Sequence, residues 1–145
     1  MERHKIVPAV FLILENDKKQ ILLMLRKNTG WKDGQWDLVS GHVEAGETAK
    51  TAMIRETKEE VGIEINQKDL KFVHFCNRHQ PENDRADFYF TASKWKGAPK
   101  IKEPDKCEAI KWFSLNDFPQ NTIDYTTMVI NCCKSGVLYS EFGWN

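Results

Sequence analysis

The sequence has no excess of charge of either sign, because 21 lysine and arginine residues balance 21 aspartate and glutamate residues. A chain without net positive charge has no general attraction for duplex nucleic acid or for an anionic membrane, so neither is an expected partner. A small polyanionic ligand remains compatible, since a bound metal ion supplies positive charge locally. The longest apolar run, Ile6 to Leu14, is too short to cross a bilayer, and the N-terminal residues lack the pattern of a secretory leader.

The four cysteines lack the spacing of a metal-binding or disulfide-rich protein. Cys76, Cys107, Cys132 and Cys133 include no CxxC pair and no zinc-type arrangement. A disulfide framework is not expected in a chain of 145 residues, which is long enough to bury a hydrophobic core. The sequence also contains no internal repeat and no low-complexity linker. We therefore expect a cytoplasmic protein with one domain over residues 1–145.

Short apolar runs between polar turns predict that most of the chain forms strands. The expected strands are Ile6 to Leu14, Gln20 to Leu25, Trp36 to Val39, Leu70 to Cys76, Ala86 to Ser93 and Ala109 to Phe113. The first two are expected to form a hairpin, and residues 78–85 a polar connection. Together with one helix after residue 40 and another near the C-terminus, these strands indicate an α/β fold with a mixed sheet.

The C-terminal third is expected to hold two capped helical segments and an aromatic tail. Ser114 to Phe118 resembles a capped helical turn, and Asn121 or Thr122 is a candidate cap for a helix that continues through Cys133. The tail that follows contains Tyr139, Phe142 and Trp144. Such a tail packs against the body of the protein or against a second subunit, and a homodimer is the expected assembly if the chain self-associates.

Three glutamates between Ser40 and Ile63 carry the strongest chemical signal. The stretch reads as a glycine-containing loop followed by a helix, and Glu47 is expected in the first turn of that helix. Glu56, Glu59 and Glu60 are spaced i, i+3, i+4 and therefore share one helix face. Like charges at this spacing repel each other, and partial burial increases the penalty unless a cation lies among them. Carboxylate oxygens are the ligands that Mg²⁺ and Mn²⁺ prefer.

The same stretch resembles the signature of the Nudix hydrolases. The resemblance rests on residues at fixed spacing, namely Gly41, five residues, Glu47, seven residues and then Arg55-Glu56-x-x-Glu59-Glu60-x-Gly62-Ile63. It implies an α/β/α sandwich with a mixed, partly antiparallel sheet, like that of the MutT-type enzymes. Two departures occur, at Thr57, where the family usually has an aliphatic residue, and at Val39-Ser40, where it usually has Pro-Gly or Ala-Gly.

The resemblance assigns a role to each residue of the signature. Glu56 and Glu60 would be the main metal ligands, and Glu59 a further ligand or the general base. Arg55 would orient these carboxylates, and Glu47 would brace the loop by pairing with Arg55. The backbone carbonyl of Ser40 would be a further metal ligand, and Gly41 would permit the tight path of the loop. The implied cofactor is Mg²⁺, with Mn²⁺ as an alternative.

The implied reaction is hydrolysis of a phosphoanhydride in a nucleoside diphosphate-linked compound. A late cluster, Glu103-Pro-Asp105-Lys-Cys107-Glu108, resembles the branch that cleaves (deoxy)nucleoside triphosphates to monophosphate and pyrophosphate. The alternatives are ADP-ribose or another nucleoside diphosphate sugar, and a non-catalytic nucleotide-binding regulatory module. RNA decapping is disfavoured by the zero net charge.

The residues that bind substrate are less well defined by the sequence. The candidates for substrate contacts are Arg26, Asn28, Trp36, Glu103 and Asp105, with Lys27, Trp31, His42, Phe88 and Phe90 as further possibilities. Glu44 is a candidate for supplementing the metal site, and Glu108 competes with Glu103 and Asp105 as the late acid. No spacing rule selects among these residues.

Overall fold

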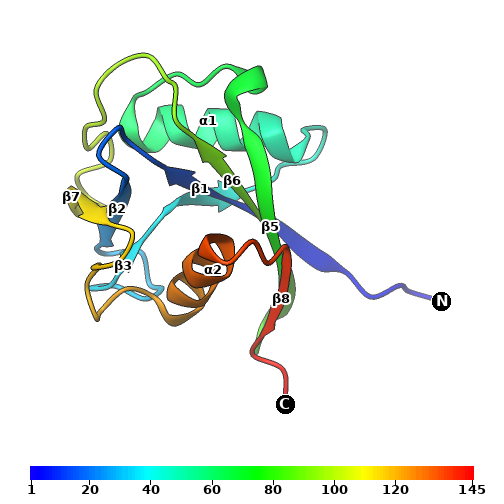
Figure 1. Cartoon of the computed structure of the whole chain (residues 1–145). Coiled ribbons are helices and arrows are strands. Elements are labelled where there is room, and N and C mark those ends of the chain that lie inside the picture. The colour runs from blue at the N-terminus through cyan, green and yellow to red at the C-terminus, as the bar shows by residue number, and fades with distance from the viewer.

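The computed structural model describes residues 1–145 and contains two sheets, two α-helices and one 3₁₀ turn (Figure 1). The elements in chain order are β1 Ile6–Leu14, β2 Gln20–Arg26, β3 Trp36–Asp37, β4 Val39–His42, α1 Ala49–Val61, η1 Gln67–Asp69, β5 Lys71–Gln80, β6 Asn83–Ala92, β7 Cys107–Ser114, α2 Asp124–Lys134 and β8 Tyr139–Phe142. Neither α-helix is long and apolar enough to cross a membrane.

The larger sheet has the strand order β4-β1-β6-β5-β8 and lies between the two helices (Figure 1). It is mixed, because β1 runs antiparallel to β4 but parallel to β6, and β8 runs parallel to β5. A smaller sheet has the order β3-β2-β7. The expected α/β/α sandwich with a mixed, partly antiparallel sheet is therefore confirmed.

Strand β1 separates two hydrophobic cores. Val10, Leu12 and Leu14 point to the side of α1 and are buried there with residues such as Met53. Phe11 and its odd-numbered neighbours point to the side of α2. Because successive side chains of a strand point to opposite faces, an uninterrupted apolar run is the pattern of a strand that is covered on both faces.

The predicted hairpin of β1 and β2 is wrong. The two strands share only an isolated bridge between Glu15 and Ile21, and each belongs to a different sheet. β2 pairs instead with β3 and with the distant β7. Both strands are apolar on both faces, which indicates burial on both faces but does not specify the neighbouring strand, and the short turn between them does not decide the pairing.

Residues 78–85 also differ from the expected polar connection. Arg78 to Gln80 complete β5 and Asn83 to Arg85 begin β6, so the two strands are joined by a tight turn. The polar character of this segment has a structural reason, because Arg78 is buried and forms an ion pair with Asp87 on the neighbouring strand. In the sequence, strand residues that form a buried ion pair are as polar as the residues of a solvated loop, so composition alone does not distinguish the two.

Helix α1 begins and ends with ordinary capping residues. The Thr48 side chain accepts a hydrogen bond from the Thr51 N–H at 3.1 Å, and Gly62 ends the helix with φ of 74°. Caps of this kind contribute about 1 kcal/mol each. Glu47 therefore lies before the N-cap and not in the first turn, as the sequence had suggested.

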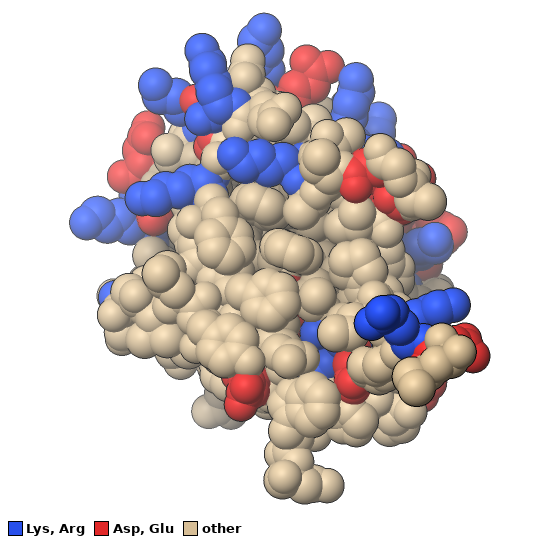
Figure 2. Space-filling view, turned by 90° about the vertical axis from the view of Figure 1, so that its right-hand side faces the viewer, with Lys and Arg blue, Asp and Glu red and all other residues tan.

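The two helical segments expected in the C-terminal third differ from the prediction. Residues 114–118 form a turn and not a helix, and α2 begins after Ile123, which has no capping side chain and is fully buried. Neither Asn121 nor Thr122 caps α2. The aromatic tail forms β8 at the edge of the larger sheet, on a face with few charged side chains (Figure 2).

Candidate active site

A cleft of about 830 Å³ opens beside the C-terminal half of α1. Glu56, Glu59 and Glu60 contribute one wall, and strand β4 contributes Ser40 and Gly41, which pair with β1 and do not lie in the expected loop. The rest of the lining comes from β1, β2, β3, β5, β6, α2 and two loops, and includes Phe11, Met24, Arg26, Asn28, Trp31, Asp37, Arg78, Gln80, Arg85, Glu103, Lys106 and Tyr125. The cleft is therefore lined by α1 together with residues from many other parts of the chain.

Gly41 lets α1 approach strand β4 closely. A Cβ atom at this position would collide with Cγ, Cδ and Oε2 of Glu56. Gly41 does not have a positive φ, so its backbone does not require glycine. The physical reason for glycine is the space that the Glu56 side chain occupies, and the position therefore controls where that carboxylate lies.

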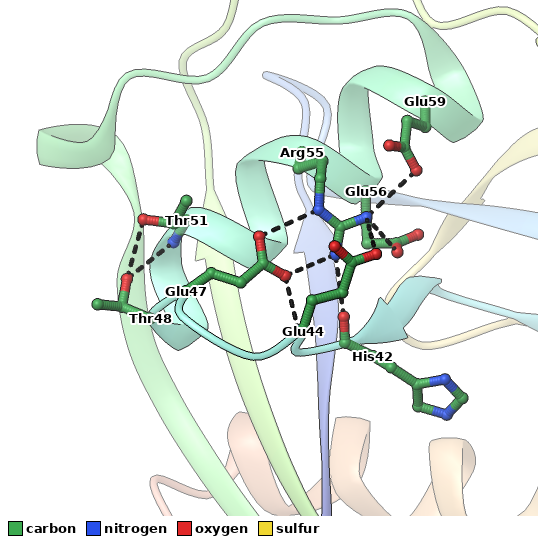
Figure 3. Close-up of polar contacts among 8 residues, drawn as sticks. All are labelled: His42, Glu44, Glu47, Thr48, Thr51, Arg55, Glu56 and Glu59. Atoms are coloured by element: carbon green, nitrogen blue, oxygen red, sulfur yellow. Dashed lines mark hydrogen bonds and ion pairs between the residues drawn. The ribbon is translucent and has the colours of Figure 1, made fainter.

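Arg55 holds the acidic residues together through several hydrogen bonds (Figure 3). Its Nε and Nη2 donate to the two carboxylate oxygens of Glu47 at 3.1 and 2.7 Å. Nη1 donates to Glu56 at 2.8 Å and to Glu59 at 3.3 Å, and Nη2 also donates to the backbone carbonyl of His42 at 3.0 Å. The expected Glu47–Arg55 pair is present, and the same guanidinium orients two carboxylates of the cleft.

Glu60 lacks the basic partner that Glu56 has. Burial raises the pKa of the Glu60 carboxyl well above its usual range, and the nearby carboxylates of Glu56 and Glu103 raise it further. Burial also raises the pKa of Glu56, whereas its bond to Arg55 acts in the opposite direction. The wall of the cleft therefore concentrates negative charge that this chain compensates only in part.

A second polar group lies on the floor of the cleft, and the sequence analysis missed it. Asp37 is only 2% exposed, and its Oδ1 accepts hydrogen bonds from the Leu38 N–H at 2.8 Å and the Thr126 hydroxyl at 2.7 Å. Both bonds go to Oδ1, so Oδ2 is available to a ligand. Burial raises the pKa of Asp37 to about 6. The only signal in the sequence was a carboxylate inside an apolar strand.

Arg78 lies beside Asp37 in the lining and is held rigidly. Its Nε donates to Asp87 at 2.6 Å, and its Nη1 donates to Gln80 at 2.8 Å. The guanidinium also stacks over the Tyr125 ring, 4.0 Å from its centroid. Nothing in the local sequence pairs Arg78 with Asp87, because their partnership depends on the register of β5 against β6.

The structure brings half of the candidate substrate and supplementary residues to the cleft. Arg26, Asn28 and Glu103 line it, as do Trp31, His42 and Glu44. Trp36 does not, because it is buried in the core with its ring 5.0 Å from that of Phe113. The other candidates outside the lining are Lys27, Phe88, Phe90, Asp105 and Glu108.

Two of these residues have clear structural roles instead. The backbone carbonyl of Asp105 accepts a hydrogen bond from the Asn28 side chain at 3.3 Å, which joins two loops at the mouth of the cleft. Phe90 is buried in the core on the α1 side. The late acid in the cleft is therefore Glu103, and the structure does not place Asp105 or Glu108 there.

The family follows from a direct comparison of the sequence. The NUDIX domain model matches residues 5–129. This chain belongs to the NUDIX family. An ADP-ribose pyrophosphatase of Methanocaldococcus jannaschii is 34% identical over 124 residues, which are 84% of this chain and 71% of that protein. An NAD-capped RNA hydrolase NudC of Pseudomonas putida is 25% identical over 79% of this chain but only 39% of its own length.

Solved structures agree with this assignment. The crystal structure of a MutT NUDIX hydrolase from Burkholderia pseudomallei superposes with a TM-score of 0.79 and 27% identity, over 88% of this chain and 98% of that one. The chain is thus a NUDIX phosphoanhydride hydrolase, with the signature helix and the cleft in the positions described above.

NUDIX hydrolases generally use divalent metal ions, and the donor set of this cleft fits such an ion. Glu56, Glu59 and Glu60 offer hard oxygen ligands, and the unpaired charge at Glu60 provides a reason for a cation to bind. No three acidic, histidine or cysteine side chains form a ready-made cluster in this structure, in which Arg55 donates hydrogen bonds to Glu56 and Glu59. The oxygen atoms of these glutamates are therefore suitable ligands for a divalent ion, and the glutamate side chains would adjust their positions when an ion binds.

Proposed function

We propose that this NUDIX hydrolase cleaves (deoxy)nucleoside triphosphates to the monophosphate and pyrophosphate in the presence of Mg²⁺ or Mn²⁺. The observation that carries the proposal is that glutamates and cationic side chains line the same cleft. Glu56 and Glu103 lie near Glu60, and Arg26 and Lys106 are among the other lining residues. Such a site suits a metal-bound polyphosphate, whose charge needs both the ion and additional cations.

Glu56 and Glu60 would hold the ion, together with the Ser40 backbone carbonyl. A bound divalent ion neutralises phosphate oxygens and lowers the pKa of a water molecule. Glu59 is suited to accept the proton from that water, because its side chain is 54% exposed and makes one long bond, at 3.3 Å, to Arg55. Arg55 and Glu47 keep these carboxylates in place, and they touch no substrate in this proposal.

The floor of the cleft is suited to hold the base of the nucleotide. Asp37 offers Oδ2 as an acceptor for an N–H group on the edge of a base, and Arg78 offers a rigid planar cation next to it. Trp31 extends over the cleft, and its indole N–H donates to the Tyr125 hydroxyl at 3.2 Å. The aromatic rings of these two residues supply apolar surface on which a base can pack.

ADP-ribose is the second candidate, because a relative with 34% identity carries the name ADP-ribose pyrophosphatase. The cleft does not discriminate by size, since about 830 Å³ is within the range of roughly 300–1,000 Å³ that small-molecule sites occupy. The two candidates differ in their products. A nucleoside triphosphate yields pyrophosphate, whereas ADP-ribose yields AMP and ribose 5-phosphate.

The decisive experiment is a product analysis with a panel of nucleoside triphosphates, ADP-ribose and nucleoside diphosphate sugars, with Mg²⁺ or Mn²⁺ and with EDTA. We expect pyrophosphate release that depends on the metal and is reduced at least about 100-fold in Glu60→Gln and Glu56→Gln. Glu64→Gln is the matched control, because Glu64 is an exposed glutamate outside the cleft that pairs with Lys58. Full metal-dependent activity in Glu60→Gln would show that the metal assignment is wrong.

A binding measurement separates failure of catalysis from failure of the metal site. We expect Mg²⁺ or Mn²⁺ to raise the melting temperature of the wild type and of Glu64→Gln, but much less that of Glu60→Gln, since a ligand at 100 times its Kd stabilises a protein by about 2.7 kcal/mol. Saturable nucleotide binding without turnover of any compound would contradict the proposed hydrolysis. Turnover of ADP-ribose alone would agree with the proposed active site but would show that ADP-ribose, and not a nucleoside triphosphate, is the substrate.

A further inference from the structure

Five large apolar side chains are exposed together around the C-terminal edge of the larger sheet. We call this group the β8 strip, and it consists of Phe72, Val137, Leu138, Tyr139 and Trp144. Leu138 is 64% exposed and Tyr139 is 50% exposed. Figure 2 shows this side of the molecule as a broad area with few lysine or arginine side chains, and the charged side chains are gathered mainly above it and to its right.

The fold explains why this area is uncovered. Helix α1 packs on β1 and β4, which lie at the other side of the sheet from β8. On the face of α1, the outer strands therefore carry a row of aromatic rings instead of a helix. Tyr139 stacks on Phe75 with the centroids 6.2 Å apart, and Phe75 meets Phe88 edge-to-face at 5.3 Å.

Strand β8 is also an open edge. It pairs with β5 on one side and has no strand on the other, so its outer backbone groups are available for pairing. Residues 137–144 contain no lysine or proline, which commonly protect an exposed edge, and Glu141 is the only charged residue among them. An open edge of this kind is a place where another strand can add.

The size of the strip matches what a dimer interface needs. Phe, Tyr and Trp each bury about 150–250 Å² when covered, so three such residues at roughly half exposure, with Val137 and Leu138, present on the order of 400 Å² of apolar surface. A stable interface buries about 800 Å² on each partner, of which a little more than half is apolar. The strip alone therefore supplies the apolar part of a standard interface.

We propose that the β8 strip is the contact surface of a homodimer in which β8 pairs antiparallel with β8 of a second copy. Both ends of the strand are apolar, with Val137 and Leu138 before it and Phe142 and Trp144 near its end. A twofold axis through the middle of β8 therefore places apolar residues opposite apolar residues.

An axis at Ser140 also gives the only charge on the strand a polar neighbour. It places Glu141 opposite Tyr139 of the second copy, on the same face of the sheet, and not opposite another glutamate. The Tyr139 hydroxyl already donates to Glu141 at 2.5 Å, which lowers the cost of keeping that carboxylate near the interface. A polyanionic partner is disfavoured, because the strip contains no cationic side chain.

The test is the mass of the full-length protein in solution, measured by sedimentation and by light scattering from about 1 to 100 µM. We expect a dimer for the wild type and a monomer for Leu138→Lys, with the dissociation constant raised at least about tenfold. Leu138 is largely exposed, so the lysine should not disturb the monomer, and circular dichroism verifies this. Gln120→Lys adds the same charge at an exposed loop position outside the strip and should remain dimeric.

Hydrogen exchange locates the interface independently of mass and of enzyme activity. We expect the backbone amides of residues 139–142 to exchange more slowly as the wild-type concentration rises, and to show no such dependence in Leu138→Lys. A wild type that is monomeric at about 100 µM overturns the proposal. A dimer that persists in Leu138→Lys, or that leaves the exchange of residues 139–142 unchanged, also overturns it.

Discussion

Asp37 should make this enzyme less stable at neutral pH than it would be with a neutral side chain. Its carboxyl is buried on the floor of the cleft, where burial raises its pKa from 3.8 to about 6. We predict that Asp37→Asn increases the free energy of unfolding at pH 7.5. Asparagine retains an oxygen that can accept from the Leu38 N–H and the Thr126 hydroxyl, so the local hydrogen bonds survive the change.

The magnitude follows from the pKa difference between the folded and unfolded chains. A shift of about two units at 1.36 kcal/mol per unit corresponds to about 3 kcal/mol of lost stability once the group is ionised. The folded chain holds this proton more tightly than the unfolded chain. The contribution of Asp37 to stability is therefore largest below pH 3.8, decreases as the pH rises to about 6, and is constant above that.

The assay is urea unfolding of the wild type and Asp37→Asn at pH 4, 5, 6 and 7.5. We expect the difference between the two proteins to be small at pH 4 and to reach up to about 3 kcal/mol at pH 7.5, or roughly 5 to 10 °C in melting temperature. Asp17→Asn is the matched control, because Asp17 is an exposed aspartate in the turn after β1. Turnover of nucleotides by Asp37→Asn should decrease, since the acceptor offered to the base is replaced by a donor.

Two results would refute this reasoning. The first is a stability difference that does not change between pH 4 and pH 7.5, which would mean that Asp37 has the same pKa in both states. The second is a lower stability of Asp37→Asn at pH 7.5. That result would show that the carboxylate is compensated in the fold by an interaction stronger than its cost of burial.

Three further substitutions test the arrangement around the cleft. Gly41→Ala should displace the Glu56 side chain, costing about 1–3 kcal/mol in urea unfolding and lowering kcat at least about tenfold, whereas unchanged kcat would contradict the steric argument. Arg78→Ala leaves Asp87 buried without its partner and should destabilise the protein by about 3–5 kcal/mol in urea unfolding at pH 7.5, and a loss below about 1 kcal/mol would refute this. Arg55→Lys keeps the positive charge but loses the planar set of N–H donors, so steady-state kinetics should show a kcat at least about tenfold lower with KM nearly unchanged. A kcat equal to that of the wild type would rule out the orienting role of Arg55.

The sequence predicted the elements that depend on local pattern. The bounds of β1 were obtained correctly because nine consecutive residues suit a strand covered on both faces. Helix α1 was expected from the signature, and in the structure it ends at Gly62, which has the left-handed conformation. The glutamates of α1 were found because their spacing on a helix is fixed by the helix itself.

The features that the sequence did not predict depend on contacts between distant segments. The partner of β2 is β7, more than 80 residues away, and no local signal favours it over the adjacent β1. The segment that contains Arg78 has a polar composition like that of a loop. Arg78 and Asp87 form a buried ion pair because β5 pairs with β6, and that pairing cannot be read from the local sequence. Trp36 was expected at the substrate, but large aromatic residues fill cores and clefts equally well, and here it fills the core.

The central position of β1 has a consequence for how this chain can change. Each of its two neighbours, β4 and β6, is aligned with it residue by residue, and its two faces complete two separate cores. Inserting or deleting one residue within Ile6–Leu14 would exchange the side chains of both cores at once. Length variation in this protein should therefore be tolerated in its loops and not in β1.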